Sequence, residues 1–303
     1  MSLLSDFLDI LCSGDAAGGL RAFDEAGRLT ALIPELEAGR GFAQPELHHY
    51  TVLDHNLAAV EALETALRGD GAWALLREST DWFEFDTALE GAIDGVPVQA
   101  LTKLSCLVHD VGKPASAVQR DGRLRFPRHG PLGAELMAER LPGAGLGPKA
   151  TAFVAANVRY HLRPGELVRN WPPSDRAVRR FAHDLGGHVL PLMLVNLSDG
   201  MATRGPHYTH DHYARHCNFL NYVVARVLHV TFEPGPPVIT GEDLITELDM
   251  PSGRLLGAVL TSIRRAQEQG GVRDRESALA LAREVLAASQ QQGSAAVRSK
   301  GQE

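Results

Sequence analysis

The chain has 303 residues, of which 44% are hydrophobic, and it carries a formal net charge of −7. This composition is that of a globular protein with a sizeable core, and no apolar run is long enough to cross a bilayer. The acidic balance argues against nucleic-acid binding by the whole surface, although it is compatible with a local basic patch. The three widely spaced cysteines suggest no disulfide framework or zinc site, and the N-terminus lacks the basic start of a secretory signal. We therefore expect a cytoplasmic protein.

Apolar residues recur at helical spacing along most of the chain, and alternating strand patterns are scarce, which predicts an all-α fold. His55 lies near the start of one such amphipathic helix. A second helix should end near residues 112–114, since a proline and the residue before it disfavour helix. This ending places His109 and Asp110 in the last turn of the second helix.

Two later helices also end at polar residues. The apolar positions within residues 153–158 predict a helix with His161 at its C-terminal end. The apolar run within residues 192–197 leads into Asp199, which again stands just before a glycine, so we expect that helix to end there. Polar side chains at several helix ends can converge on one cavity.

The sharpest break in the pattern is the proline- and glycine-rich run 233–237, which favours a linker or tight turn. The end of the chain is rich in Gln, Ser, Gly and charge, which is typical of disorder. The sequence thus predicts a neck-like helical segment (1–45), a metal-binding domain (46–233), a C-terminal helical segment (234–288) and a disordered tail (289–303).

The adjacent pair His109-Asp110 closes an apolar run, where a charged group is costly unless it is paired or bound to a metal. Each histidine taken alone is more often a packed or surface residue than a ligand, but the candidates together favour a metal site. Mixed nitrogen and oxygen ligands suit Fe, Mn, Ni, Co or Zn better than Mg or Ca. The candidate ligands are His55, His109, Asp110, His129, His161 and Asp199.

Several basic residues are candidates for binding phosphate. Only four of the 30 basic residues are lysines, and Lys113 follows Asp110 by three positions, where a compact ammonium can neutralise phosphoryl charge. Residues 159–180 contain six arginines but two acidic residues, which fits either a solvated helix face or a phosphate-recruiting patch. From this group we select Arg159 and Arg163, and from elsewhere Arg204, as candidate substrate-binding residues.

The remaining histidines are weaker candidates. His48 and His49 precede the His55 helix and can donate hydrogen bonds to the ligands. The histidine-rich stretch 207–216 contains a second His-Asp pair, His210-Asp211, but no apolar helix precedes it. We interpret this stretch as a loop close to the site rather than as a set of ligands.

In its order of motifs the chain resembles the HD superfamily of metal-dependent phosphohydrolases. The superfamily pattern of one His, then His-Asp, then a later Asp is matched by His55, His109-Asp110 and Asp199. The two further histidines, His129 and His161, resemble those of HD proteins that hold two metals. The resemblance implies an HD-domain helical bundle with Asp110 bridging the metals.

A narrower resemblance is to the body of CCA-adding tRNA nucleotidyltransferases and poly(A) polymerase relatives. It is carried by residues 23–29, 32–36, 44–45, 48–55, 126–134, 237–244 and 257–271. The nucleotidyltransferase head of that family needs a glycine-rich loop followed by paired acidic residues on a strand. Gly18-Gly19 is not followed by such a pair, so we expect no nucleotide addition.

The resemblance implies a phosphohydrolase that cleaves phosphomonoesters or phosphodiesters through a metal-activated hydroxide. Its substrate would be a nucleotide, a cyclic nucleotide or an RNA-terminal phosphate, with Asp110 and Lys113 as catalytic residues. One or two divalent transition metals per chain are implied as cofactors. The alternatives are a tRNA- or RNA-binding protein without catalysis and a regulatory domain that binds a nucleotide without cleaving it.

Overall fold

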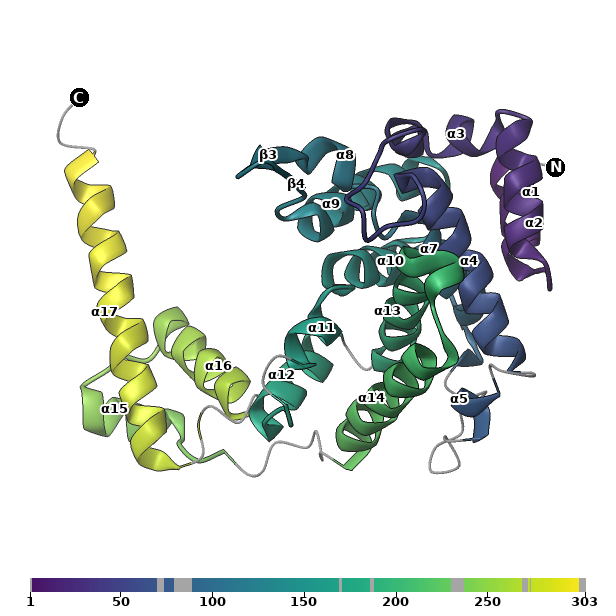
Figure 1. Cartoon of the computed structure of the whole chain (residues 1–303). Coiled ribbons are helices and arrows are strands. Elements are labelled where there is room, and N and C mark those ends of the chain that lie inside the picture. Colours follow the sequence, from purple (N-terminus) through teal and green to yellow (C-terminus); the bar gives the residue numbers. More distant parts are fainter. Residues whose placement is uncertain are drawn as a thin grey trace. The chain divides into compact units, whose positions relative to one another are not determined.

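The computed structural model describes residues 2–69, 74–78, 89–168, 171–185, 188–229, 237–268, 272 and 274–299. The fold is mainly helical, as the sequence predicts, with two short β-hairpins in the described parts (Figure 1). Its contacts form two units, the first made of Met1–Pro172 and Leu185–Ala225, and the second of Pro173–Asp184 and Arg226–Glu303. No described helix is both long and apolar enough to cross a membrane.

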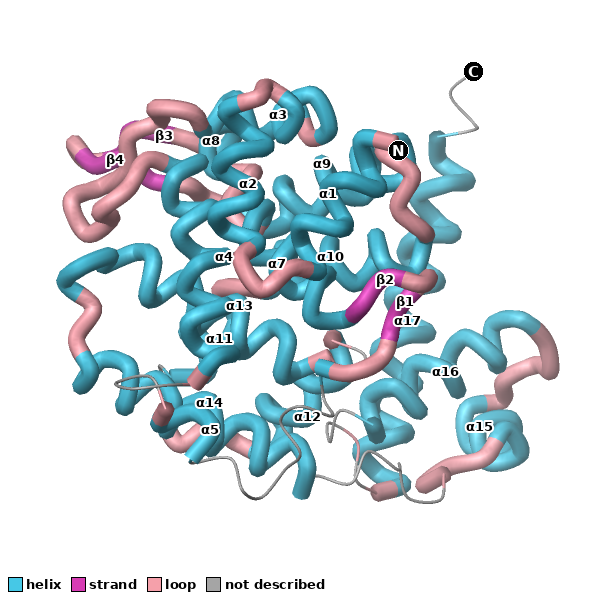
Figure 2. Tube along the Cα trace, turned by 90° about the vertical axis from the view of Figure 1, so that its right-hand side faces the viewer, coloured by secondary structure: helices cyan, strands magenta, loops and turns pink. Residues whose placement is uncertain are grey.

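The first unit is built from helices of very different length, and Figure 2 separates them from the strands and loops. Its helices are α1 (Leu3–Cys12), α2 (Ala16–Glu25), α3 (Arg28–Leu32), η1 (Pro34–Gly39), α4 (Val52–Arg68), α5 (Leu75–Glu78), α7 (Val98–Val108), α8 (Lys113–Ser116), α9 (His129–Gly143), α10 (Pro148–Tyr160), α11 (Arg163–Val168), α13 (Val189–Arg204), η3 (Gly205–His207) and most of α14 (His210–His229). Its hairpins pair β1 (Ala92–Ile93) with β2 (Val96–Pro97) and β3 (Val118–Arg120) with β4 (Arg123–Arg125).

The core of the first unit lies between α4, α7 and α13, with α10 against α7 and α9 against α10. Helix α4 and helix α7 are buried on most sides, which is expected for helices that are apolar nearly all round. The sequence did not predict the hairpins, because strands of two or three residues are too short to show a periodicity.

A buried ion pair fixes the N-terminal helices to this core. Glu64 of α4 accepts hydrogen bonds from the backbone N–H groups of Ala16 and Ala17 at 2.7 and 3.2 Å. Lys103 of α7 binds the same carboxylate at 2.9 Å and donates to the carbonyl of Ser13 at 2.7 Å. The start of α2 is therefore held by a carboxylate from the core.

The second unit contains α12 (Asp175–Asp184), α15 (Gly241–Leu248), α16 (Arg254–Glu268) and α17 (Arg275–Ser299). Thr240 and Asp243 form a reciprocal capping box that begins α15. A small separate core brings α15, α16 and α17 together, formed by Ile239, Leu244, Met250, Val259, Ile263, Val272, Ala278, Leu279 and Ala282.

The predicted disordered tail stays a prediction, although the backbone of this segment is described as helical. Helix α17 continues to Ser299, through most of the segment 289–303. Its Gln and Ala residues have good helix propensity and no proline interrupts them, so a polar composition does not prevent helix here. Most of the run 233–237 lies outside the described residues, and the four predicted domain boundaries stay a prediction.

Candidate metal centre

All six predicted ligands meet in the first unit, and most of them lie at helix ends. His55 is in the first turn of α4, His109 directly follows α7, and Asp110 comes next. His129 is the first residue of α9, and His161 directly follows α10.

Asp199 differs from the expectation, because α13 does not end beside it. The helix continues through Gly200 to Arg204. A Cβ atom at Gly200 would lie 3.2 Å from the ring of His216, so this glycine gives room to a neighbouring helix rather than ending its own. Asp199 therefore projects from the interior of a helix.

The first cluster contains two histidines and two carboxylates. The Nε2 atoms of His55 and His109 lie 3.1 Å apart, and His55 Nε2 is 3.2 Å from Asp199 Oδ1. Asp110 Oδ2 lies 3.3 Å from both of these nitrogens. Four ligand atoms thus lie within 4.8 Å of one another, as a single metal ion requires.

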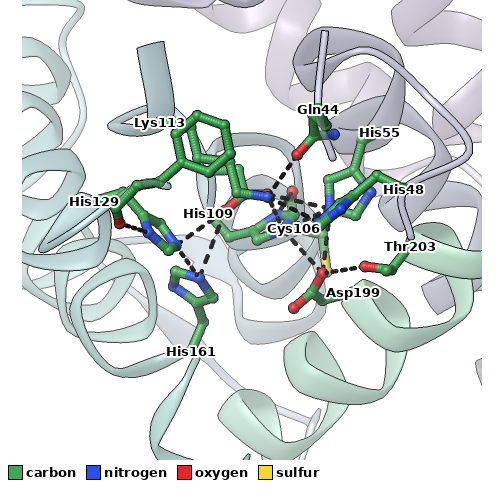
Figure 3. A network of polar contacts seen from close by, with 12 residues as sticks. Gln44, His48, His55, Cys106, His109, Lys113, His129, His161, Asp199 and Thr203 are labelled. Atoms are coloured by element: carbon green, nitrogen blue, oxygen red, sulfur yellow. Dashed lines mark hydrogen bonds and ion pairs between the residues drawn. The ribbon is translucent and has the colours of Figure 1, made fainter. Parts of the chain in front are cut away.

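The second cluster shares the same aspartate. The Nε2 atoms of His129 and His161 are 3.1 Å apart, and they lie 3.3 and 3.6 Å from Asp110 Oδ1. Figure 3 shows His129 and His161 on one side of the site, and His55 and Asp199 on the other. Because its two oxygens face different clusters, Asp110 is placed to bridge two ions.

The hydrogen bonds of His129 and His161 show whether a cation would fit between them. Nδ1 of His129 donates to the Phe126 carbonyl at 2.8 Å, and Nδ1 of His161 donates to the Val158 carbonyl at 2.7 Å. In its neutral form a ring held in this way presents an Nε2 lone pair, and two lone pairs that face each other cannot form a hydrogen bond. A cation between these nitrogens and Asp110 Oδ1 would satisfy all three atoms, so the ligand set fits a metal.

The protonation states favour metal binding. Burial alone would raise the pKa of Asp110, but His109 and Lys113 hold that pKa well below its usual range. Burial similarly opposes ionisation of Asp199, whose pKa is nevertheless lowered by hydrogen bonds from His109 and His55. Burial and the neighbouring His109 lower the pKa of His161 to about 4. The carboxylates are therefore ionised and His161 is neutral near pH 7, as ligation requires.

Neighbouring carboxylates favour the protonated form of His109. Burial acts to lower its pKa, but the carboxylates of Asp110 and Asp199 outweigh burial and raise the pKa to about 10. Its Nδ1 atom lies 2.7 Å from the Cys106 carbonyl, which fixes the ring. A metal ion bound at Nε2 would replace this proton.

Lys113 lies directly against the bridging aspartate. Its Nζ atom is 2.5 Å from Asp110 Oδ2 and donates to Gln44 Oε1 at 2.7 Å. His48 Nε2 lies 3.4 Å from the same ammonium, and burial followed by Lys113 lowers the pKa of His48 to about 4. The segment before α4 thus supplies a neutral imidazole and an amide that surround Lys113. The sequence analysis included Gln44 in a motif of the family resemblance but gave it no role at the site.

Residues behind the ligands were also missed. Thr203 donates to Asp199 Oδ1 at 3.1 Å, and Asn196 donates to the His161 carbonyl at 3.2 Å. The Asn196 side-chain oxygen in turn lies 3.0 Å from Nε2 of His216. The histidine-rich stretch lies near the site as predicted, but the predicted loop is wrong, because helix α14 begins at His210 and carries His216 into this network.

The three candidate arginines lie at the surface of the first unit. Arg159 is 3.9 Å from the Glu135 carboxylate, and the Arg163 guanidinium lies 5.2 Å from the centre of the Tyr160 ring. Arg204 is the exposed last residue of α13. Their role in substrate binding stays a prediction.

The chain is similar to tRNA nucleotidyltransferases along most of its length. It is 28% identical over 270 residues to an A-adding tRNA nucleotidyltransferase from Deinococcus radiodurans. The aligned region covers 87% of this chain and 53% of the relative. A CC-adding tRNA nucleotidyltransferase from Thermus thermophilus is 28% identical over 90% of this chain and 54% of its own length. The chain thus spans about half the length of these relatives.

A second group of relatives matches a shorter part of the chain. A bifunctional uridylyltransferase/uridylyl-removing enzyme from Cereibacter sphaeroides is 31% identical over 179 residues, or 58% of this chain and 17% of the relative. No protein-family model matches the chain. The predicted likeness to tRNA nucleotidyltransferases is confirmed, whereas membership of the HD superfamily stays a prediction.

Proposed function

We propose that this chain is a metal-dependent phosphohydrolase of the HD type, acting on a nucleotide, a cyclic nucleotide or an RNA-terminal phosphate. The observation that carries the proposal is the carboxylate of Asp110, whose two oxygens face two separate histidine pairs. A structural core does not need such an arrangement, because buried ionised groups are costly to keep. Two neighbouring divalent ions are a recurrent device for displacement at phosphorus.

The residues divide into two ligand sets that meet at Asp110. His55, His109 and Asp199 would complete one set, and His129 and His161 the other. Bound divalent metals would supply a nucleophilic water near neutral pH and neutralise phosphoryl charge. Lys113 adds a fixed positive charge at the junction of the two sets, where it can stabilise charge on the phosphoryl oxygens.

The relatives support the same chemistry. Two are named for addition of nucleotides to tRNA, which favours a nucleotide or RNA substrate. Another group is named in part for removal of uridylyl groups, which favours hydrolysis at a nucleotidyl phosphorus. The region of similarity to the tRNA enzymes also keeps open the alternative of an RNA-binding protein without catalysis.

The test measures metal content and hydrolysis together. Purified protein is analysed for transition metals and assayed with Mn, Ni, Co, Fe, Zn or Mg on bis(p-nitrophenyl) phosphate and on 2′,3′-cyclic nucleotides. Asp110→Asn should lose bound metal, and its turnover should fall by more than about 100-fold. This loss is larger than that expected from removing a residue that only hydrogen-bonds to a metal ligand. The second His-Asp pair offers a matched control, since Asp211 is exposed and Asp211→Asn should behave as wild type.

Two outcomes would contradict the proposal. Normal turnover by Asp110→Asn would show that the bridging carboxylate has no role in the reaction. Absence of metal and of hydrolysis with every ion, together with retained RNA binding, would favour the non-catalytic alternative.

A further inference from the structure

The β3–β4 hairpin carries its arginines on one face. The register pairs Val118 with Arg125 and Arg120 with Arg123. Residues directly opposite each other share a face of an antiparallel pair, as do residues two apart on one strand. Arg120, Arg123 and Arg125 therefore point to the same side, which we call the arginine face, and Leu124 points to the other.

The described residues supply no charged partner for these arginines. Leu124 is half-buried, whereas the three arginines are exposed, and none of them has an ion pair to a carboxylate of a described residue. Arg120 and Arg123 stand directly opposite each other, and like charges at such positions are destabilising. The array therefore has a stability cost that an anionic partner would relieve.

The hairpin displays the arginines in a defined position. Asp121 and Gly122 form its two-residue turn with φ values of 53° and 70°, the left-handed pair that matches the twist of a tight hairpin. In Figure 1 and Figure 2 the hairpin lies beside α8 at the edge of the first unit.

The base of the hairpin is part of the metal centre. Phe126 directly follows β4, and its carbonyl accepts the hydrogen bond that orients His129. The Phe126 ring lies 5.5 Å from the Lys113 ammonium and 6.2 Å from the ring of Phe42. Arg128, also exposed, directly precedes His129. Arg125 is only four residues from His129, so a short chain of phosphates is long enough to connect the candidate metal site with the hairpin.

We propose that the arginine face binds the phosphate backbone of a single-stranded nucleic acid whose end lies at the metal centre. This inference rests on the proposed function and narrows its substrate to a polynucleotide end. Guanidinium groups bind phosphate through paired hydrogen bonds, and Arg123 and Arg125 are about 7 Å apart along their strand, so each can reach a different phosphate. The hairpin residues 118–125 include no aromatic side chain on which a base could stack, so binding depends on phosphates rather than on sequence.

The experiment measures binding of a fluorescein-labelled 12-nucleotide RNA by anisotropy in EDTA, so that hydrolysis does not interfere. The variant Arg120→Gln/Arg123→Gln/Arg125→Gln should raise Kd by at least about 10-fold. The slope of log Kd against log salt concentration should fall by the amount expected for the loss of about two to three phosphate contacts. A control removes three exposed arginines elsewhere in the same unit, Arg21→Gln/Arg68→Gln/Arg215→Gln, with the same change in net charge. The control should change Kd less than about twofold, and thermal unfolding checks that both variants are folded.

The outcomes separate this inference from the proposed function. Equal RNA affinity of the hairpin variant and wild type would overturn the inference, even if wild type hydrolyses bis(p-nitrophenyl) phosphate. Equal competition by polyglutamate of matched charge would also overturn it, because the face would then select acidic protein as readily as phosphate. If the hairpin variant binds RNA more weakly but wild type hydrolyses neither phosphomonoesters nor phosphodiesters, the arginine face is supported and the proposed enzyme activity is contradicted.

Discussion

The contact between Gly112 and His129 gives the sharpest test of how the second ligand set is positioned. A Cβ atom at Gly112 would lie 2.2 Å from the His129 carbonyl oxygen and 2.7 Å from the Gly133 nitrogen. Reaching an ordinary contact of 3.4 Å requires a separation of about 1.2 Å between backbone segments, not the rotation of a side chain. Gly112→Ala should therefore destabilise the fold by about 1–3 kcal/mol.

The same displacement should affect metal binding. His129 is a proposed ligand of the second set, and metal–ligand distances vary by only about 0.2 Å. Gly112→Ala should thus retain metal in the first set and lose it from the second, so that the metal content falls from two ions per chain to one. Urea unfolding and elemental analysis measure the two effects. Gly143→Ala, at the other end of α9 with open space around its Cβ position, is the matched control. Wild-type stability and metal content in Gly112→Ala would refute the argument.

Two further predictions concern stability. Lys103→Met should lower the free energy of unfolding in urea by about 3–5 kcal/mol, because it leaves the Glu64 carboxylate buried without its cation. The double variant Glu64→Gln/Lys103→Met should recover part of this loss. A loss below about 1 kcal/mol for Lys103→Met would contradict the prediction. Burial lowers the pKa of His216 from 6.5 to about 4, so the unfolded chain takes up a proton there that the folded chain does not. This contributes a stability loss of up to about 3 kcal/mol as the pH falls through that window, and His216→Gln should show a shallower decline between pH 6.5 and 4 than wild type. An identical slope in the two proteins would count against that assignment.

The clustering of the candidate ligands could be predicted because these residues are unusual in type and position. A His-Asp pair at the end of an apolar run conflicts with ordinary core formation, and a local sequence pattern can show such a conflict. The helices that carry His55, His109 and His161 also follow from apolar spacing. Asp199 was selected as a candidate because of its residue type, although the predicted end of its helix was wrong. Gly200 was interpreted as the end of the helix, whereas the helix continues to Arg204.

The supporting residues could not be predicted in the same way. Gln44, Asn196 and His216 act through contacts between segments that are far apart in sequence, and local context gave none of them a specific role. The arginine face depends on a hairpin register, which three-residue strands do not reveal. These features depend on the approach of distant segments, which local periodicity does not encode.

The two ligand sets differ in charge, and this difference links the glycine contact to the metal content. The first set has the carboxylates of Asp110 and Asp199, whereas the second has only the other oxygen of the shared Asp110. A divalent ion in the second set is therefore less well neutralised and depends more on the geometry of its two neutral histidines. That geometry depends on close backbone approach, because a Cβ atom at Gly130 would lie 3.0 Å from the Arg159 carbonyl oxygen, beside His161. The lack of a side chain at Gly112 and Gly130 thus lets α9 approach closely enough to position His129. When packing is disturbed, the second set should therefore lose its metal before the first.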